Sequence, residues 1–214
     1  MTLDSQGRDP RLWKVEAASS IRRFIASLNK HVIYFAGYGE LGYEEEGSVR
    51  SVALQVLSEW VTDKVLVHSG TLMRLGGQDG IAEVYRVARE LGIETTGIHP
   101  SISMEFADTH RVSPDCDHVF FVEDKTWGGF LDDCGQLSPT LDLHLKVSDE
   151  LIVIGGGKHA ADELRAFINC GKPARYYPAD MNYATTLQWA KGAGLTIADF
   201  RGAARSVWDT IRNR

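Results

Sequence analysis

The sequence lacks any apolar run near the roughly 18 residues that a membrane-spanning helix needs, so we expect no such helix and no membrane partner. Residues 1–8 also lack the apolar core of a secretory signal and are interpreted as a short polar leader. Cysteine is scarce, with only Cys116, Cys134 and Cys170, all far apart in the chain. No pair has the spacing of a zinc knuckle or a redox dithiol, so we expect neither a disulfide framework nor a structural metal. These absences predict a cytoplasmic protein with reduced thiols.

An excess of basic residues is also missing. The 214 residues include 23 Lys and Arg against 29 Asp and Glu, which gives a formal net charge of −6. This balance argues against a protein that neutralises many phosphates on a nucleic acid, although it leaves room for a local basic patch. A small anionic ligand needs only one suitable pocket. The expected partner is therefore a small molecule rather than a nucleic acid.

Short β-rich runs alternate with amphipathic helices from about residue 31 onwards. Most of these runs are apolar on both sides of the strand, which is typical of a parallel sheet covered on both faces. The expected strands are 31–36, 64–68, 94–98, 118–122, 151–154 and 174–177. Alternation of this kind predicts an α/β, Rossmann-like, doubly wound, mainly parallel sheet of about six strands with helices on both faces.

The helical segments show apolar residues at three- and four-residue spacing. Such faces cover 49–61, 81–91 and 160–168, and further helices are expected near both ends of the chain. Thr196 and Asp199 fit a capping box before the last of these helices. We therefore interpret residues 1–30 as a leader and a helix packed on the domain, and residues 31–214 as one Rossmann-like nucleotide-binding domain. The least regular segments are 99–117 and 124–148.

Three strand ends are followed by glycine-rich turns. In a parallel sheet these turns share one edge, where glycine lets a backbone approach a phosphate and the next helix directs free N–H groups at it. Each turn by itself is equally consistent with a tight strand-to-helix connection. Together they predict a nucleotide-type site, with candidate ligand-binding residues Gly37, Tyr38, Gly39, Gly42, Ser69, Gly70, Thr71, Arg74, Gly76, Gly77, Gly155, Gly156, Gly157, Lys158 and His159.

The first turn has the spacing of the dinucleotide fingerprint, with Gly37, Gly39 and Gly42 after a strand. The acidic run 44–46 behind it would repel a pyrophosphate, and no acidic residue ends the second strand to hold a ribose. An ordinary NAD dehydrogenase is therefore disfavoured, and no particular cofactor is predicted beyond a nucleotide ligand.

Other polar and aromatic residues near these turns have two readings each. Lys158 and His159 stand at a helix start, where they either grip a phosphate or base edge or form a solvated pair. Arg74 is a candidate phosphate contact or a surface arginine. Asp79 is expected to cap the helix near residue 80. The segment 127–130 either forms an aromatic lid over a base or packs beneath a loop.

The order of these motifs resembles the SLOG superfamily of Rossmann-like proteins over about residues 31–180. The resemblance lies in the glycine-rich turn after the first strand, in Ser69-Gly70 followed by residues 76–80, in residues 92–100 and in residues 148–157. The superfamily includes the LOG phosphoribohydrolases (often labelled lysine-decarboxylase-like), the DNA-processing protein DprA and nucleotide-sensing domains. Oligomers are common among its members, so the resemblance implies a homo-oligomer.

The LOG enzymes carry a glycine motif followed by a glutamate that assists cleavage of a nucleotide's N-glycosidic bond. Aligning this motif with Gly156 and Gly157 places Glu163 on that glutamate. Glu163 also lies on the flank of the helix's apolar stripe, whereas Asp162 is expected nearly opposite. An exposed helix carboxylate is the simpler interpretation of Glu163. The family's arginine before the motif has no counterpart, because no arginine lies between Arg111 and Arg165.

Three functions follow as hypotheses, and the sequence leaves open whether the protein is an enzyme. The first is a SLOG-like sensor or carrier that binds a nucleotide or nucleotide-derived molecule. The second is a LOG-like hydrolase of nucleoside monophosphates with Glu163 as its tentative catalytic residue. The third, disfavoured by the acidic composition, is a DprA-like binder of single-stranded DNA.

Overall fold

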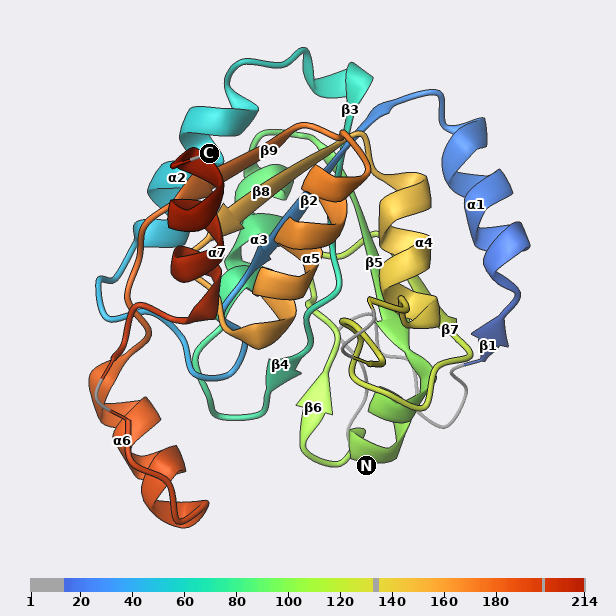
Figure 1. Ribbon diagram of the computed structural model, residues 1–214. Coiled ribbons are helices and arrows are strands. Elements are labelled where there is room, and N and C mark those ends of the chain that lie inside the picture. Colours follow the sequence, from blue (N-terminus) through green and yellow to red (C-terminus); the bar gives the residue numbers. More distant parts are fainter. Residues whose placement is uncertain (1–13, 133–134, 198, 214) are drawn as a thin grey trace.

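The computed structural model describes residues 14–132, 135–197 and 199–213, and its core is a seven-stranded sheet (Figure 1). Every neighbouring pair in this sheet is parallel. The strand order is β1-β7-β5-β3-β2-β8-β9. The strands are β1 (Val15–Glu16), β2 (His31–Gly37), β3 (Val65–Ser69), β5 (Glu94–Pro100), β7 (His118–Val122), β8 (Glu150–Ile154) and β9 (Ala174–Tyr177).

The order of the strands creates a topological switch point. The chain runs outward from β2 through β3 and β5 to β7, then crosses over and continues on the other side of β2 with β8 and β9. The helices that follow β2 and β8 therefore leave the sheet in opposite directions. In open α/β sheets this arrangement leaves a crevice beyond the carboxyl ends of the two strands, where ligands bind.

Helices cover both faces of the sheet (Figure 1). They are α1 (Ala18–Ser27), α2 (Ser48–Leu57), α3 (Glu83–Glu90), α4 (Pro139–Val147), α5 (Lys158–Asn169), α6 (Tyr183–Gly192) and α7 (Ala203–Arg212), with short 3-10 turns at Thr62–Lys64, Gly80–Ala82 and Ser101–Phe106.

Alternate residues of β2 define the two layers. Ile33 and Phe35 pack in the cluster that contains α2 and α3. Tyr34 and Ala36 point to the opposite face and pack in the cluster formed with α4, α5 and α7. Val32 lies on that second face too, among residues of α1 and α4. This period of two is the expected geometry of a strand buried on both faces.

The predicted fold class is confirmed, and the six expected strands are all present. The seventh, β1, lies in the segment assigned to an N-terminal helix, which begins only at Ala18. The polar leader at residues 1–8 lies outside the described residues. Along the described part of the chain, no helix is long and apolar enough to cross a membrane.

One helix was missed and two predicted caps are wrong. Helix α4 falls in a segment interpreted as irregular, where Ser138 caps it by accepting from the N–H of Leu141. The capping box at Thr196 and Asp199 is wrong, because α7 begins at Ala203 after Gly202 and Asp199 instead binds Arg201. Asp79 provides no side-chain cap for the turn that follows it.

Two smaller features extend from the carboxyl edge of the sheet. Strands β4 (Met73–Arg74) and β6 (His110–Arg111) form an antiparallel pair there. Helix α6 projects away from the body of the molecule at the lower left (Figure 1). Only Thr186 and Ala190 of this helix are buried.

Candidate functional site

A cavity of about 620 Å³ lies at the switch point between β2 and β8. Its inner wall comes from the ends of β2 and β3 and from residues of α4 and α5, while its mouth includes residues from the loops around β6 and from α6. The volume is in the range of pockets that hold a cofactor or other small molecule. The cavity is therefore the candidate ligand site.

The first turn of α5 forms one side of this cavity. Gly157 precedes the helix, and Gly157, Lys158, His159 and Ala160 all line the cavity. The first N–H groups of a helix have no partner within it, and the helix dipole places partial positive charge there. No acidic side chain occupies this first turn. The arrangement favours an anionic group of a ligand at this position.

The floor of the cavity contains a carboxyl group joined to the central strand. Tyr34 of β2 donates its hydroxyl hydrogen to Glu163 Oε1 of α5 at 2.6 Å. The Glu163 side chain is only 13% exposed. Burial raises its pKa to about 7, while the hydrogen bond from Tyr34 opposes that shift. The exposed-carboxylate interpretation of Glu163 is thus wrong, and the group has a proton affinity suited to transfer near neutral pH.

Three buried histidines are each bound to a backbone carbonyl, and one of them, His144, lines the cavity. His144 Nε2 donates to Ile98 O at 3.2 Å, His68 Nδ1 to Thr96 O at 3.1 Å, and His99 Nδ1 to Gly70 O at 3.2 Å. Burial lowers the pKa of His144 and of His99 to about 4, and it also lowers the pKa of His68. All three rings are therefore neutral at pH 7, with one nitrogen of each left as an acceptor.

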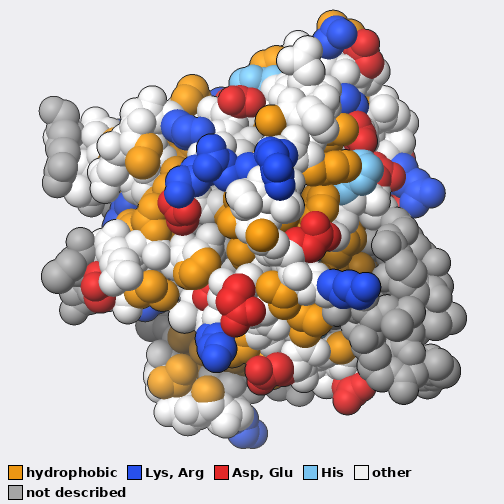
Figure 2. Space-filling view, turned by 90° about the vertical axis from the view of Figure 1, so that its right-hand side faces the viewer, with side chains coloured by type: hydrophobic (Ala, Val, Ile, Leu, Met, Phe, Trp, Pro, Cys, Tyr) orange, Lys and Arg blue, Asp and Glu red, His pale blue; other side chains and the backbone are white. Residues whose placement is uncertain are grey.

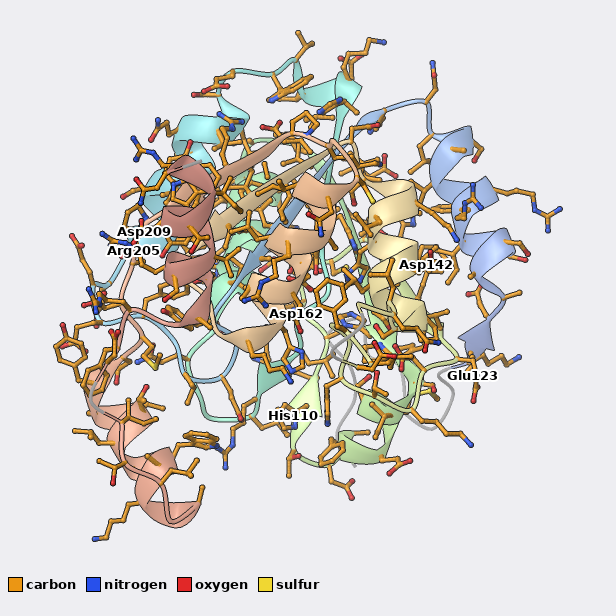
Figure 3. All side chains as sticks on the ribbon, viewed as in Figure 1. His110, Glu123, Asp142, Asp162, Arg205 and Asp209 are labelled. Carbon is orange, nitrogen blue, oxygen red and sulfur yellow. The ribbon has the colours of Figure 1, made fainter. Side chains whose placement is uncertain are left out.

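Aromatic side chains form the mouth of the cavity. Trp127 lies 46% exposed against Phe106, with ring centroids 5.0 Å apart, and Trp189 of α6 is 43% exposed. All three line the cavity. His110 of β6, labelled in Figure 3, lies at the same mouth with Nε2 3.6 Å from Glu40 Oε2. Exposed aromatic rings at a pocket mouth are suited to stack on a planar ligand.

Charge around the cavity is sparse. Lys158 is the one Lys or Arg in the described lining, which also contains the carboxylates of Glu40 and Glu163. On the face seen in Figure 2, basic side chains gather in a small band among acidic and apolar ones. This site can hold one anionic group, but it lacks the row of cations that a nucleic-acid backbone requires.

The structure brings most of the predicted site residues together. Those that line the cavity are Gly37, Tyr38, Gly39, Ser69, Gly70, Thr71, Gly157, Lys158, His159 and Glu163. The remaining candidates, which lie outside the lining, are Gly42, Arg74, Gly76, Gly77, Gly155 and Gly156. Arg74 instead lies 3.6 Å from Glu40, with which it forms an ion pair. Asp162, expected to point away, is buried and accepts a hydrogen bond from the N–H of Phe130.

The dinucleotide spacing of the first turn has a structural explanation. A Cβ at Gly37 would overlap the hydroxyl of Tyr43, which accepts from Tyr38 N at 3.0 Å and donates to Ile154 O at 2.9 Å. Gly42 does not open a helix, since α2 begins only at Ser48. The turn therefore lacks the helix start that binds a pyrophosphate in the dinucleotide motif.

Gly155 and Gly156 are also required by packing. Both have positive φ, at 56° and 111°. A Cβ at Gly156 would lie 2.5 Å from that of Ala160, and one at Gly155 would meet the Tyr38 ring. Gly157 differs, because a Cβ there would meet no described atom within 4 Å. Of these three glycines, only Gly157 is left available to a ligand.

No role was predicted from the sequence for Tyr34 or His144. The sequence does contain a signal for both residues, because each is a polar residue within an otherwise apolar core segment. A buried polar group needs a specific hydrogen-bond partner, so such a residue indicates a polar contact in the core. The pairing itself joins β2 with α4 and α5, whose segments are far apart in the sequence. Elsewhere, the described residues contain no group of three His, Cys, Asp or Glu placed to hold a metal ion.

Comparison with known proteins returns structures but no sequence family. No model of a protein family matches the chain, and no curated protein matches it. Among solved structures, the Moco carrier protein of Chlamydomonas rheinhardtii is 18% identical over 86% of this chain and 98% of its own, with a TM-score of 0.45. The molybdenum cofactor binding protein of Rippkaea orientalis is 17% identical over 86% and 96%, with a TM-score of 0.46.

A third solved structure is titled TM1055, a structural-genomics target. It is 22% identical over 67% of this chain and 72% of its own, with a TM-score of 0.45.

Proposed function

We propose that this protein binds a nucleotide or nucleotide-derived small molecule in the cavity at the switch point. The observation that carries the proposal is the convergence of the α5 start, the buried Glu163 and an aromatic mouth on one cavity of about 620 Å³. A nucleotide combines the three matching features: an anionic phosphate, a polar sugar or base edge, and a planar ring.

The phosphate is proposed to lie at the first turn of α5. The N–H groups of residues 158–160 point out of the helix there, and Lys158 adds a full positive charge. Burial lowers the pKa of the neighbouring His159, so its ring is neutral at pH 7 and donates through one nitrogen only. A single terminal phosphate suits this small donor set better than a triphosphate does.

The base is proposed to reach the aromatic mouth. Trp127 and Trp189, which come from distant segments of the chain, both expose ring surface at the mouth. Gly128 and Gly129 follow Trp127, so the backbone there carries no side chains. Stacking on such rings tolerates different bases. Selection among bases then depends on polar groups deeper in the cavity.

The test is a thermal-shift screen against nucleoside mono- and diphosphates, NAD, ADP-ribose and cyclic dinucleotides. The molybdenum cofactor completes the panel, because two of the compared proteins are named for carrying or binding it. A ligand supplied at about 100 times its dissociation constant stabilises a fold by about 2.7 kcal/mol. We expect at least one nucleotide to raise the melting temperature accordingly. No shift with any member of the panel contradicts the proposal.

A second candidate function is hydrolysis of the N-glycosidic bond of a nucleoside monophosphate. It is favoured by one observation, the placement of Glu163 in the cavity with a pKa raised to about 7 by burial. As a carboxylate it would stabilise positive charge that develops on the sugar, and as an acid it would donate a proton to the leaving base. Tyr34 would hold the carboxyl in place through its 2.6 Å hydrogen bond.

Chromatography of a nucleoside monophosphate after incubation with the protein separates the two functions. Hydrolysis requires release of free base together with ribose 5-phosphate, and its loss in Glu163→Gln. Nucleotide binding without base release leaves the sensor or carrier as the function. Base release that persists in Glu163→Gln contradicts this mechanism.

A further inference from the structure

The floor of the cavity holds a buried acceptor with no partner. His144 lines the cavity and is 3% exposed, and its Nε2 hydrogen is used by Ile98 O. Its other nitrogen, Nδ1, therefore carries a lone pair. None of the described residues donates a hydrogen bond to it. Buried polar groups of this kind normally have a hydrogen-bond partner, so the unpaired Nδ1 points to a donor on a ligand.

A second acceptor lies beside the first. Glu163 Oε1 is 3.9 Å from His144 Nδ1, too far for a hydrogen bond between them. The hydrogen of Tyr34 is already given to Oε1, and Tyr34 is the one donor to Glu163 among the described side chains. When Glu163 is ionised, the cavity floor thus offers a neutral nitrogen and a carboxylate to a ligand, with no free hydrogen of its own at this point.

The 3.9 Å separation restricts what fills the gap. One donor atom can lie about 2.9 Å from both acceptors, the usual hydrogen-bond distance. To satisfy both, that atom must carry two hydrogens. Among the neutral donor groups of an organic ligand, a hydroxyl or a ring N–H carries one hydrogen, whereas a primary amino group carries two.

We infer that Glu163 and His144 together select ligands bearing a primary amino group, such as the exocyclic amine of an aminopurine or aminopyrimidine. This inference rests on the proposed function and names the ligand chemistry that the floor recognises. The same ligand has its anionic end at the start of α5, since Lys158 and Glu163 lie on successive turns of one helix that lines the cavity. Ligands with an oxo group in place of the amine would place an acceptor against two acceptors.

Matched nucleotide pairs test the inference on the wild-type protein. IMP is GMP without its 2-amino group and with nothing added. In the other two pairs, AMP with IMP and CMP with UMP, the first nucleotide has an exocyclic amine where the second has an oxo group. Titration calorimetry at pH 8, where Glu163 is mostly ionised, gives each dissociation constant. We expect the tightest ligand to carry an amine and to bind at least about tenfold more tightly than its amine-free partner.

Two variants assign the preference to the floor. Glu163→Gln should reduce the ratio within the preferred pair to near one, because the new amide donates to His144 Nδ1 itself. Trp127→Phe is the matched control at the mouth of the same cavity and should keep the ratio even if overall affinity changes. His144→Gln, checked for folding by thermal denaturation, should reduce the ratio as Glu163→Gln does.

Each outcome decides a different claim. Equal affinity within every pair, or a tighter amine-free ligand, overturns the inference and leaves nucleotide binding intact. A strong amine preference that survives in Glu163→Gln overturns the assignment to this floor. Absence of binding by all five nucleotides contradicts the proposed function, and the inference falls with it.

Discussion

Tyr34 of β2 donates its hydroxyl hydrogen to Glu163 of α5 across 2.6 Å, and this bond joins the central strand to the helix at the cavity floor. The bond holds a carboxyl group that burial would otherwise keep protonated. Tyr34 itself is so buried that its own pKa is raised well above the ordinary value, so it remains a donor at all working pH values. The pair gives the cavity a titratable group in a fixed orientation.

Replacing Glu163 by Gln should change how stability depends on pH. The folded-state pKa of about 7 lies above the unfolded value near 4.5, so the folded state binds the proton more tightly. The raised pKa stabilises the folded wild type below pH 4.5. As pH rises from 4.5 to 7, this contribution to the free energy of unfolding is lost, by about 3 kcal/mol in all. The stability of Glu163→Gln relative to wild type should therefore increase across that window.

Urea denaturation at several pH values measures this difference. The groups that face Glu163 are Tyr34, His144 and Asp162, and they remain in both proteins. Glu105→Gln, at an exposed position, is the control for loss of a carboxylate in itself. A difference between Glu163→Gln and wild type that stays flat from pH 4.5 to 7 contradicts a raised pKa.

His144 should contribute with the opposite sign. Burial holds its folded-state pKa at about 4, below the unfolded value near 6.5. The stability associated with its neutral form is fully present above pH 6.5 and is lost as pH falls toward 4, by about 3 kcal/mol. His144→Gln should therefore show a shallower loss of stability below pH 6.5 than the wild type. Parallel curves in that range would show that His144 takes up its proton as easily in the folded state.

Two adjacent glycines should respond differently to alanine. Gly156 has φ 111° and a blocked Cβ position, whereas Gly157 meets no described atom within 4 Å and has φ −83°. We expect Gly156→Ala to destabilise the fold by about 2 kcal/mol or more, and Gly157→Ala to change stability by less than about 1 kcal/mol. Thermal denaturation of both variants makes the comparison. Equal tolerance at the two positions would remove the packing explanation of Gly156.

Much of the fold was predictable because strands and helices are local patterns. The apolar runs of β2, β3 and β8 and the glycines after them located the sheet edge and most of the cavity. What could not be predicted depends on contacts between distant segments. Tyr43 packs against Gly37, the first glycine of the dinucleotide spacing, and its hydrogen-bond partner Ile154 comes from another strand. Helix α4 was missed because its cap, Ser138, lies in a segment rich in glycine and proline.

The exposed face of α6 predicts self-association. Tyr183 and Leu187, one turn apart on the same face, are each more than 40% exposed, and their helix projects from the body of the molecule (Figure 1). Exposed apolar groups gathered on one element favour an interface between chains. We expect a dimer by sedimentation velocity and a monomer for Leu187→Asp, with unchanged melting at low concentration. A wild-type protein that is monomeric at high micromolar concentration contradicts this expectation.

The most direct test of nucleotide binding at the start of α5 is calorimetric titration of the tightest ligand into wild type, Lys158→Glu and Lys125→Glu. An acidic residue in the first turn favours the helix, so Lys158→Glu should fold at least as well as the wild type. Lys125 is exposed and lies outside the cavity lining, so its variant controls for net charge. If nucleotide binds at the start of α5, we expect unchanged affinity in Lys125→Glu and a loss of about tenfold or more in Lys158→Glu. Equal affinity in all three proteins, or no binding by the wild type, would contradict it.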